Sequence, residues 1–365
     1  MNKYIFANQL RGIAAILVVM THYFGTYFAE QALLASRTFS PEMGFKPSAW
    51  VRYFELPYQG PLGVAVFFLI SGFVIPFSLR KTSIPGFLVN RVLRIFPTYI
   101  CCLALGTLAI WLSARYWGQA FSYDGKVLAA NALLVHNLMN LPSMDSVNWT
   151  LAIEIKFYLL AALFAFALFR KSAAWLLGFL ALAAAFTWYH ASGHLSALVT
   201  PVMELNYLIF MMIGVLFHQH VSGLISTPAL AVRVLSVLAV FSFTWSVGPQ
   251  KGQFPAVTIW YYSAVAVFAL CYFNRERFRP VRVLDFFADI SYPLYCVHPL
   301  VGYCVLKALM GNGLPFGGAV IVALAIAVGL AWLVHRTVET GSNQLGRRWA
   351  RRLTPQPQAP AAMPA

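Results

Sequence analysis

The sequence predicts an all-α, polytopic integral membrane protein. Of its 365 residues, 60% are hydrophobic and only 10% are charged, and the mean hydropathy is +0.70. An ordinary soluble domain carries about 25% charged residues and has no interior large enough for so much apolar surface. These values exclude a soluble enzyme, a disordered protein and a nucleic-acid-binding protein. Helices are the expected spanning elements because each satisfies its own backbone hydrogen bonds in lipid.

Ten apolar runs approach the length of about 20 residues with which a helix crosses a bilayer. They lie at 10–29, 62–79, 95–112, 150–169, 173–190, 200–218, 229–247, 256–273, 288–310 and 315–335. An eleventh segment, 127–141, is shorter and contains Asn131, His136, Asn137 and Asn140.

The basic residues predict the topology. Three basic clusters, at 80–94, 275–282 and 336–352, flank the apolar runs, and such clusters stay on the cytoplasmic side. All three clusters lie on the cytoplasmic side only if the chain crosses the membrane an odd number of times between residues 113–126 and Arg170. We therefore expect ten spans with both termini cytoplasmic, and a re-entrant or interfacial segment at 127–141. This places 18 of the 26 Lys and Arg residues inside and 6 outside.

The chain divides into a membrane domain at 1–335 and a basic cytoplasmic tail at 336–365. The Pro- and Ala-rich end of the tail, from about Leu353, is expected to be disordered. The formal net charge of +15 is thus a feature of the cytoplasmic face, which attracts anionic ligands or anionic lipids. No metal site is expected, because the five cysteines lack metal-ligand spacing and His218 and His220 have no third ligand nearby.

Two ionisable residues inside the predicted spans are candidate catalytic groups, because such residues are costly in lipid. His22 lies twelve residues beyond Leu10, about 18 Å along a helix and in the outer half of the membrane. Glu154 lies five residues from Trp149, about 8 Å from the outer end of its helix. Their similar depth predicts a carboxylate–imidazole pair, which would fix the tautomer of His22 and raise its basicity. Lys156 faces another side of the helix and is expected to reach outward to the membrane surface.

Three arginines at the cytoplasmic surface are candidate phosphate-binding residues. Arg11 begins the first span, and Arg91 and Arg94 lie on one face of the third. Arginine binds phosphate through paired hydrogen bonds. The alternative, that these are ordinary positive-inside anchors, remains open.

Further polar and aromatic residues are candidates for binding a substrate: His298, Asn137, Ser71 and Trp149. His298 lies near mid-membrane, where a packed histidine and a site residue are equally expected. Asn137 lies on the irregular segment, and such backbone at depth usually lines a cavity. Ser71 is also expected to pack or bond to backbone, with Gly72 allowing two helices to approach closely. Glu204 and Asp289, near helix ends, are expected to be structural.

The segments that carry these residues resemble the acyltransferase-3 family of integral membrane acyltransferases. LRGIAAILVVMTH at 10–22 looks like the first helix of that family. LGVAVFFLISGFVI at 62–75, FLVNRVLRIFPTYI at 87–100 and VNWTLAIEIKFYLL at 147–160 look like its next motifs. LNYLIFMMIGVLF at 205–217 and ISYPLYCVHPLVG at 290–302 look like later helices. The order and spacing agree over nearly the whole chain.

The resemblance implies acyl transfer, usually of acetyl, from cytoplasmic acyl-CoA to a hydroxyl of an extracytoplasmic glycan or glycolipid. His22 would be the general base, Glu154 would orient it or hold the acceptor, and Arg11, Arg91 and Arg94 would bind the phosphates of CoA. Acyl-CoA would be a co-substrate, with no tightly bound cofactor. The bacterial cytoplasmic membrane is the expected location, and a homo-oligomer is left open.

Two other classes are weighed against this function. A transporter or flippase for a glycolipid or lipid-linked sugar also has about ten helices and buried ionisable residues, but it has no need of arginines for CoA. A scaffold of a polysaccharide-export complex has no need of His22 and Glu154 at matching depth. A covalent acyl-enzyme on Ser71 or a cysteine is the minor mechanistic alternative.

Overall fold

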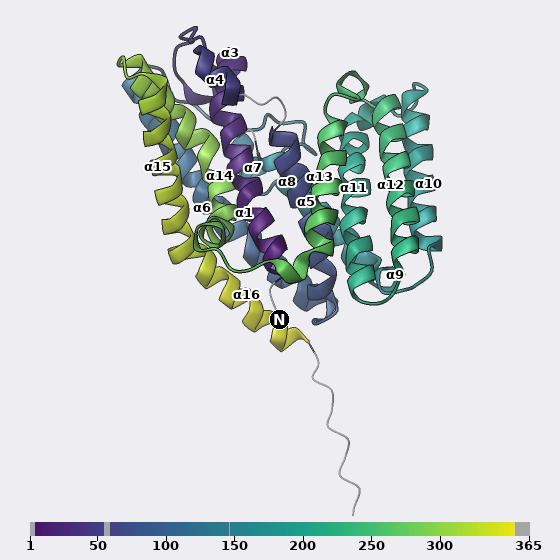
Figure 1. The fold of residues 1–365 in the computed structure, drawn as a ribbon. Helices are drawn as coiled ribbons and strands as arrows, with labels where there is room; N and C mark the ends of the chain where they lie inside the picture. Colours follow the sequence, from purple (N-terminus) through teal and green to yellow (C-terminus); the bar gives the residue numbers. More distant parts are fainter. Residues whose placement is uncertain (1–3, 55–58, 146, 355–365) are drawn as a thin grey trace, which may run out of the picture.

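The computed structural model describes residues 4–54, 59–145 and 147–354, and within these ranges it is helical without any strand (Figure 1). All ten apolar runs are helices, which confirms the predicted fold class. They correspond to α1 (Ile5–Met20) with its continuation to Ala29, α5 (Gln59–Leu79), α6 (Ile84–Tyr116), α8 (Asn148–Leu163), α10 (Ala174–Ala191), α11 (Val199–Val221), α12 (Thr227–Val247), α13 (Thr258–Phe273), α14 (Arg282–Gly311) and α15 (Phe316–Val334).

Eight helical segments of the described chain are long and apolar enough to cross a membrane. Both α8 and α13 have only 16 residues, so the count of ten crossings remains a prediction. The described ends of the chain, the start of α1 and the helix α16 (Thr340–Leu353), lie at the same end of the bundle (Figure 1). The short helices α3 (Gln31–Thr38) and α4 (Ala49–Phe54) lie at the opposite end.

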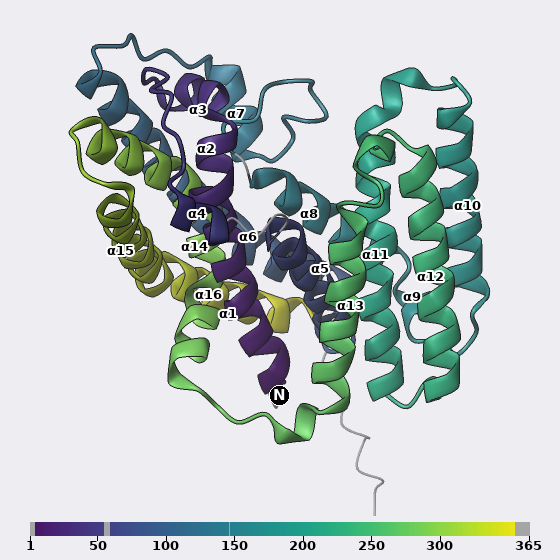
Figure 2. The ribbon, with the colours of Figure 1, turned by 45° about the horizontal axis from the view of Figure 1, so that its top comes forward.

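The helix α14 is the centre of one half of the bundle and packs against α1, α6 and α15. The helix α5 packs against α1, α11 and α13 and so joins the two halves. Beyond it, α10, α11 and α12 stand side by side on one flank (Figures 1 and 2).

Glycines bring α5 and α11 into backbone contact. A Cβ added to Gly72 would lie 2.1 Å from the carbonyl oxygen of Met211, and one added to Gly214 would lie 2.3 Å from that of Leu69. No side chain fits at either position, because the obstructing atoms are backbone. The close approach predicted at Gly72 is confirmed.

The segment 127–141 begins within α7 (Gly125–Ala132) and continues as a series of turns. The side-chain amide of buried Asn131 donates from Nδ2 to the backbone carbonyl oxygens of Val127 and Pro142, and its Oδ1 accepts from Asn148 Nδ2. Asp145 accepts from the backbone N–H of Asn148 and thereby caps the start of α8. The polar side chains here fix the position of α8, which carries Glu154.

The chain remains helical beyond α15. A π-helical turn, η5 (His335–Glu339), leads into α16, which packs along α6. Gly346 of α16 lies against Asn90, whose Oδ1 is only 2.8 Å from where a Cβ would stand. The predicted boundary at 335/336 thus falls within one helical run. The disorder predicted from about Leu353 concerns residues 355–365, which lie outside the described residues.

The expectation for Lys156 was wrong. Its Nζ is 2.6 Å from Glu204 Oε2, and both carboxylate oxygens of Glu204 accept from it. The side chain of Lys156 is 28% exposed and that of Glu204 is 9% exposed. An ion pair between α8 and α11 costs less in an apolar environment than two separate charges, so the lysine turns to Glu204 and not to the surface.

Candidate active site

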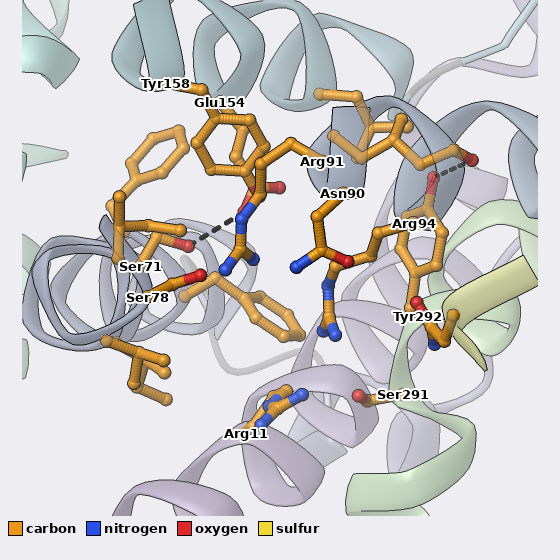
Figure 3. A pocket seen from close by; sticks show the side chains of 18 of the residues that line it. Arg11, Ser71, Ser78, Asn90, Arg91, Arg94, Glu154, Tyr158, Ser291 and Tyr292 are labelled. Atoms are coloured by element: carbon orange, nitrogen blue, oxygen red, sulfur yellow. Dashed lines mark hydrogen bonds between the residues drawn. The ribbon is translucent and has the colours of Figure 1, made fainter. Parts of the chain in front are cut away.

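A single elongated cavity of about 520 Å³ joins most of the predicted binding residues. It lies between α5, α6, α8, α14 and α16, and its wall includes Arg11, Ser71, Arg91, Arg94 and Glu154 (Figure 3). The residues that line it on α5 run from Val64 to Ser78, about 21 Å along a helix axis, and Lys81 and Thr82 beyond the end of α5 extend the wall further. The cavity therefore suits a long, extended ligand.

The two ends of the cavity differ in character. Near the end of α5, the wall carries Lys81, Thr82, Asn90 and the arginines, together with Arg347 and Arg351 of α16. Toward the start of α5, the wall consists mainly of Val64, Phe67, Leu151 and Tyr295. Six lining residues are basic and one, Glu154, is acidic. Such a cavity accepts a ligand with an anionic head and a less polar arm.

Arg11, Arg91 and Arg94 direct their guanidinium groups toward the same space (Figure 3). The guanidinium of Arg91 lies 5.3 Å from the ring centroid of Phe87 and 5.4 Å from that of Tyr158, which hold it in place. Among the described residues, none of the three arginines forms an ion pair, and the buried Nε atoms of Arg11 and Arg91 have no hydrogen-bond partner. Buried donors of this kind call for an acceptor, and a cluster of guanidinium groups selects an anion.

Glu154 lies beside these arginines on α8. Its Oε1 accepts hydrogen bonds from Ser71 Oγ at 3.0 Å and from Tyr158 Oη at 2.5 Å. Ser71 thus contacts a carboxylate and not the backbone. Its hydrogen is given to Glu154, and this polar group stands halfway along the cavity wall (Figure 3).

His22 lies outside the cavity, on a π-helical turn, η1 (Thr21–Thr26), that interrupts the first membrane helix. Its Nδ1 is 2.7 Å from Nε2 of His298 on α14, and the two ring planes are 18° apart with centroids separated by 4.9 Å. The next residue, Tyr23, donates from its hydroxyl to the carbonyl oxygen of His298 at 2.9 Å. π-Helical turns in α-helices are frequent at functional sites, and this one carries His22 against α14.

The histidine pair lies just beyond the apolar end of the cavity. His298 is one helical turn past Tyr295, which lines the cavity, and the ring centroids of the two residues are 6.2 Å apart. On α1, the side chain of Val18 lies at the level of Gly63, and His22 is one turn further. Tyr295 therefore separates the cavity from the histidines.

The predicted His22–Glu154 pair was wrong. The polar partner of His22 is His298, whereas Glu154 contacts Ser71 and Tyr158. Depth along a helix can be counted from the sequence, but the direction in which a side chain points depends on packing. Trp149 and Asn137 do not line the cavity: Trp149 packs against Phe68 and Tyr207.

Sequence reasoning missed the contribution of α16. Asn343, Arg347 and Arg351 lie on one face of this helix at four-residue spacing and line the basic end of the cavity. The four-residue spacing of these residues is a sequence signal for one face of a helix. It was not used in the prediction of the site because residues 336–365 were expected to form a tail outside the membrane domain.

Comparisons with known proteins agree with this architecture. A family model described as an acyltransferase domain matches residues 4–336. Nodulation protein 10 of Rhizobium leguminosarum bv. viciae is 32% identical over 30% of this chain, but the match covers only 34% of that protein. Acyltransferase MdmB of Streptomyces mycarofaciens is 25% identical over 88% of this chain and 91% of its own length. No solved structure matches.

The family model spans both halves of the bundle and every cavity-lining residue except those of α16, which lies beyond residue 336. The chain therefore belongs to the acyltransferase-3 family and is a membrane acyltransferase.

Proposed function

We propose that the protein transfers an acyl group, with acetyl as the expected group, from cytoplasmic acyl-CoA to a hydroxyl of an extracytoplasmic glycan or glycolipid. The observation that carries this proposal is the elongated cavity with apolar walls at one end and, at the other, arginines that form no ion pair within the described part of the chain. CoA has the matching form, with phosphates at one end and a long pantetheine arm that ends in the thioester. Acyl-CoA acts as a co-substrate, and no tightly bound cofactor is proposed.

In this proposal the phosphates bind Arg11, Arg91 and Arg94, and the pantetheine arm extends along α5 toward Tyr295. A bidentate arginine–phosphate contact gives both affinity and orientation. The thioester then lies near the histidine pair, on the far side of Tyr295. A side-chain movement of Tyr295 would open the path between them.

His22 is the proposed general base. Its Nε2 takes the proton of the acceptor hydroxyl as the oxygen attacks the thioester carbonyl. The new ester C–O bond forms, the C–S bond breaks, and the proton passes from His22 to the departing CoA sulfur. Atoms and charges balance without a further reactant. Glu154 holds the donor arm or the acceptor from the cavity side.

The acceptor class follows from the family resemblance and from the place of His22, about 18 Å along a helix from Leu10 and so in the outer half of the predicted membrane. A hydroxyl that approaches from the extracytoplasmic side would meet His22 there. The relatives come from bacteria, which supports the bacterial cytoplasmic membrane as the location.

The test is thermal unfolding of the purified protein in lipid nanodiscs with and without acetyl-CoA. A ligand that binds only the folded state raises the free energy of unfolding, by about 2.7 kcal/mol at a hundredfold excess of ligand over Kd, and therefore raises the melting temperature. The double variant Arg91→Ala with Arg94→Ala should lose this shift. Arg277→Ala with Arg282→Ala is the control, because it removes two exposed arginines outside the cavity. No shift with acetyl-CoA, longer acyl-CoAs or free CoA would contradict CoA as the donor.

A further inference from the structure

The hydrogen bonds around His298 determine which nitrogen of His22 carries a proton. His298 Nδ1 is 2.9 Å from the carbonyl oxygen of Leu294, one turn earlier in α14. A carbonyl oxygen only accepts hydrogen bonds, so Nδ1 of His298 must donate and carry the hydrogen. In a neutral imidazole the other nitrogen, Nε2, is then an acceptor.

The same reasoning extends to His22. Nε2 of His298 is 2.7 Å from Nδ1 of His22. Because Nε2 of His298 accepts, Nδ1 of His22 must be the donor, and its hydrogen lies between the rings. Nε2 of His22 is then left unprotonated. Within the described part of the chain this atom has no hydrogen-bond partner, and the ring is only partly buried.

The backbone keeps this arrangement in place. Tyr23 Oη donates to the carbonyl oxygen of His298 and lies over Gly302, where an added Cβ would be 2.0 Å from that hydroxyl. Pro299 has no N–H, so it cannot donate to the carbonyl of Tyr295 one turn earlier. The ring of His298 therefore lies near two backbone carbonyl oxygens, that of Leu294 and the one left free on Tyr295, and both favour a hydrogen on Nδ1.

We propose that His298 is a positioning residue that holds His22 in the Nδ1–H tautomer and leaves Nε2 of His22 as the free base. The proposal rests on the proposed function, in which His22 takes the proton of the acceptor hydroxyl. In this proposal the partner that orients His22 is the neutral, buried imidazole of His298, and not the carboxylate of Glu154 that the sequence predicted. A neutral partner suits this depth because no charge has to be buried until the proton is transferred.

The test is solid-state nitrogen NMR of protein with isotope-labelled histidine, reconstituted in lipid bilayers. The signals of His22 are identified by their loss in His22→Asn. The wild type should show a protonated Nδ1 and an unprotonated Nε2 for His22. His298→Phe keeps a ring but removes the acceptor, so His22 should lose this single tautomer. His298→Gln places an amide oxygen near the position of Nε2 and should retain it.

Three results would overturn the proposal: a protonated Nε2 on His22 in the wild type, protonation of both nitrogens, or a His22 tautomer that is unchanged in His298→Phe. This measurement needs neither acyl-CoA nor an acceptor. Absence of a thermal shift with acetyl-CoA in the wild type would therefore contradict the proposed function without altering the tautomer result.

Kinetics add a second readout, with acetyl-CoA as donor and octyl glucoside as the probe acceptor. In His298→Phe, kcat should fall by about 10²–10⁴-fold, the range seen for lost general-base catalysis and for a wrong histidine tautomer. KM for acetyl-CoA should stay the same, because His298 does not line the donor cavity. His298→Gln should recover part of kcat. An unchanged kcat in His298→Phe would overturn the role of His298 in positioning the base.

Discussion

Ser71 and Tyr158, from α5 and α8, both donate their hydroxyl hydrogens to the same carboxylate oxygen, Oε1 of Glu154. Oε2 of Glu154 has no donor among the described residues, and Glu154 lines the cavity. The two hydroxyls hold one oxygen of the carboxylate in place and leave the other available to a ligand.

Replacement of Glu154 by Gln should reduce acyl transfer while acetyl-CoA binding persists. The change keeps the shape but removes the charge, and a hydrogen bond to a charged group is worth about 1.5–3 kcal/mol, or about 10- to 100-fold in rate. Ser71→Ala should have a smaller effect, since Tyr158 still holds the same oxygen. Turnover and the acetyl-CoA thermal shift are measured side by side. Full turnover in Glu154→Gln would remove Glu154 from the mechanism.

Much of the fold was predictable from composition and periodicity. Each apolar run became a helix, because a segment of that length in lipid has few other ways to satisfy its backbone. The close approach at Gly72 was predicted from the small residue alone, although its partner Gly214 could not be identified. Helix pairing depends on contacts between segments more than a hundred residues apart.

The site was predictable in part. Arg11, Arg91 and Arg94 share one cavity, as was expected from their predicted common position at the cytoplasmic ends of two helices. The partner of His22 was assigned wrongly, because residues at equal depth on two helices can face different neighbours. The π-helical turn at Thr21–Thr26 also changes the direction of His22, and no local pattern in the sequence predicted this turn.

Replacement of Gly72 or Gly214 by Ala should lower the melting temperature in nanodiscs. The added Cβ meets backbone atoms of the facing helix, and overpacking of this kind costs about 1–3 kcal/mol. Gly178→Ala on α10 is the matched control, because a Cβ there meets nothing within 4 Å. The control should be neutral or slightly stabilising, since Ala favours helix more than Gly. Equal melting temperatures for all three variants would contradict the tight α5–α11 contact.

Lys156 and Glu204 should show strong coupling in a double-mutant cycle. Lys156→Met or Glu204→Gln alone leaves one charge without its partner, and breaking a buried pair in this way costs about 3–5 kcal/mol. Lys156 is partly exposed, so we expect the lower part of that range or less. The double variant should have a higher melting temperature than either single variant. Additive losses would show that the two side chains act independently.

His22→Gln should abolish acyl transfer but preserve the acetyl-CoA thermal shift. A positioned general base contributes about 10²–10⁴-fold, and His22 lies outside the donor cavity. The two measurements separate loss of chemistry from loss of binding. Near-normal transfer would mean that another group accepts the proton, and rapid-quench trapping of labelled protein would then test for an acyl-enzyme on Ser71 or a cysteine.

The arginines of α16 should contribute to recognition of the outermost phosphate of CoA. Arg347 and Arg351 line the basic end of the cavity, more than about 21 Å from its apolar end when measured along α5, where the 3′-phosphate of an extended CoA would lie. The wild type should therefore be stabilised more by CoA than by dephospho-CoA, which lacks that phosphate. Arg347→Gln with Arg351→Gln should remove this difference, because each lost charge-assisted hydrogen bond is worth about 1.5–3 kcal/mol.

The neighbouring residues Arg348 and Arg352 provide the control for this prediction. They are also exposed on α16, carry the same charge and do not line the cavity. Arg348→Gln with Arg352→Gln lowers the net charge of the protein by the same amount, so a general electrostatic effect would weaken CoA binding equally in both double variants. Recognition of the 3′-phosphate predicts that only the cavity-facing pair affects the preference for CoA over dephospho-CoA. If that preference survives in Arg347→Gln with Arg351→Gln, α16 packs against α6 without contacting the donor.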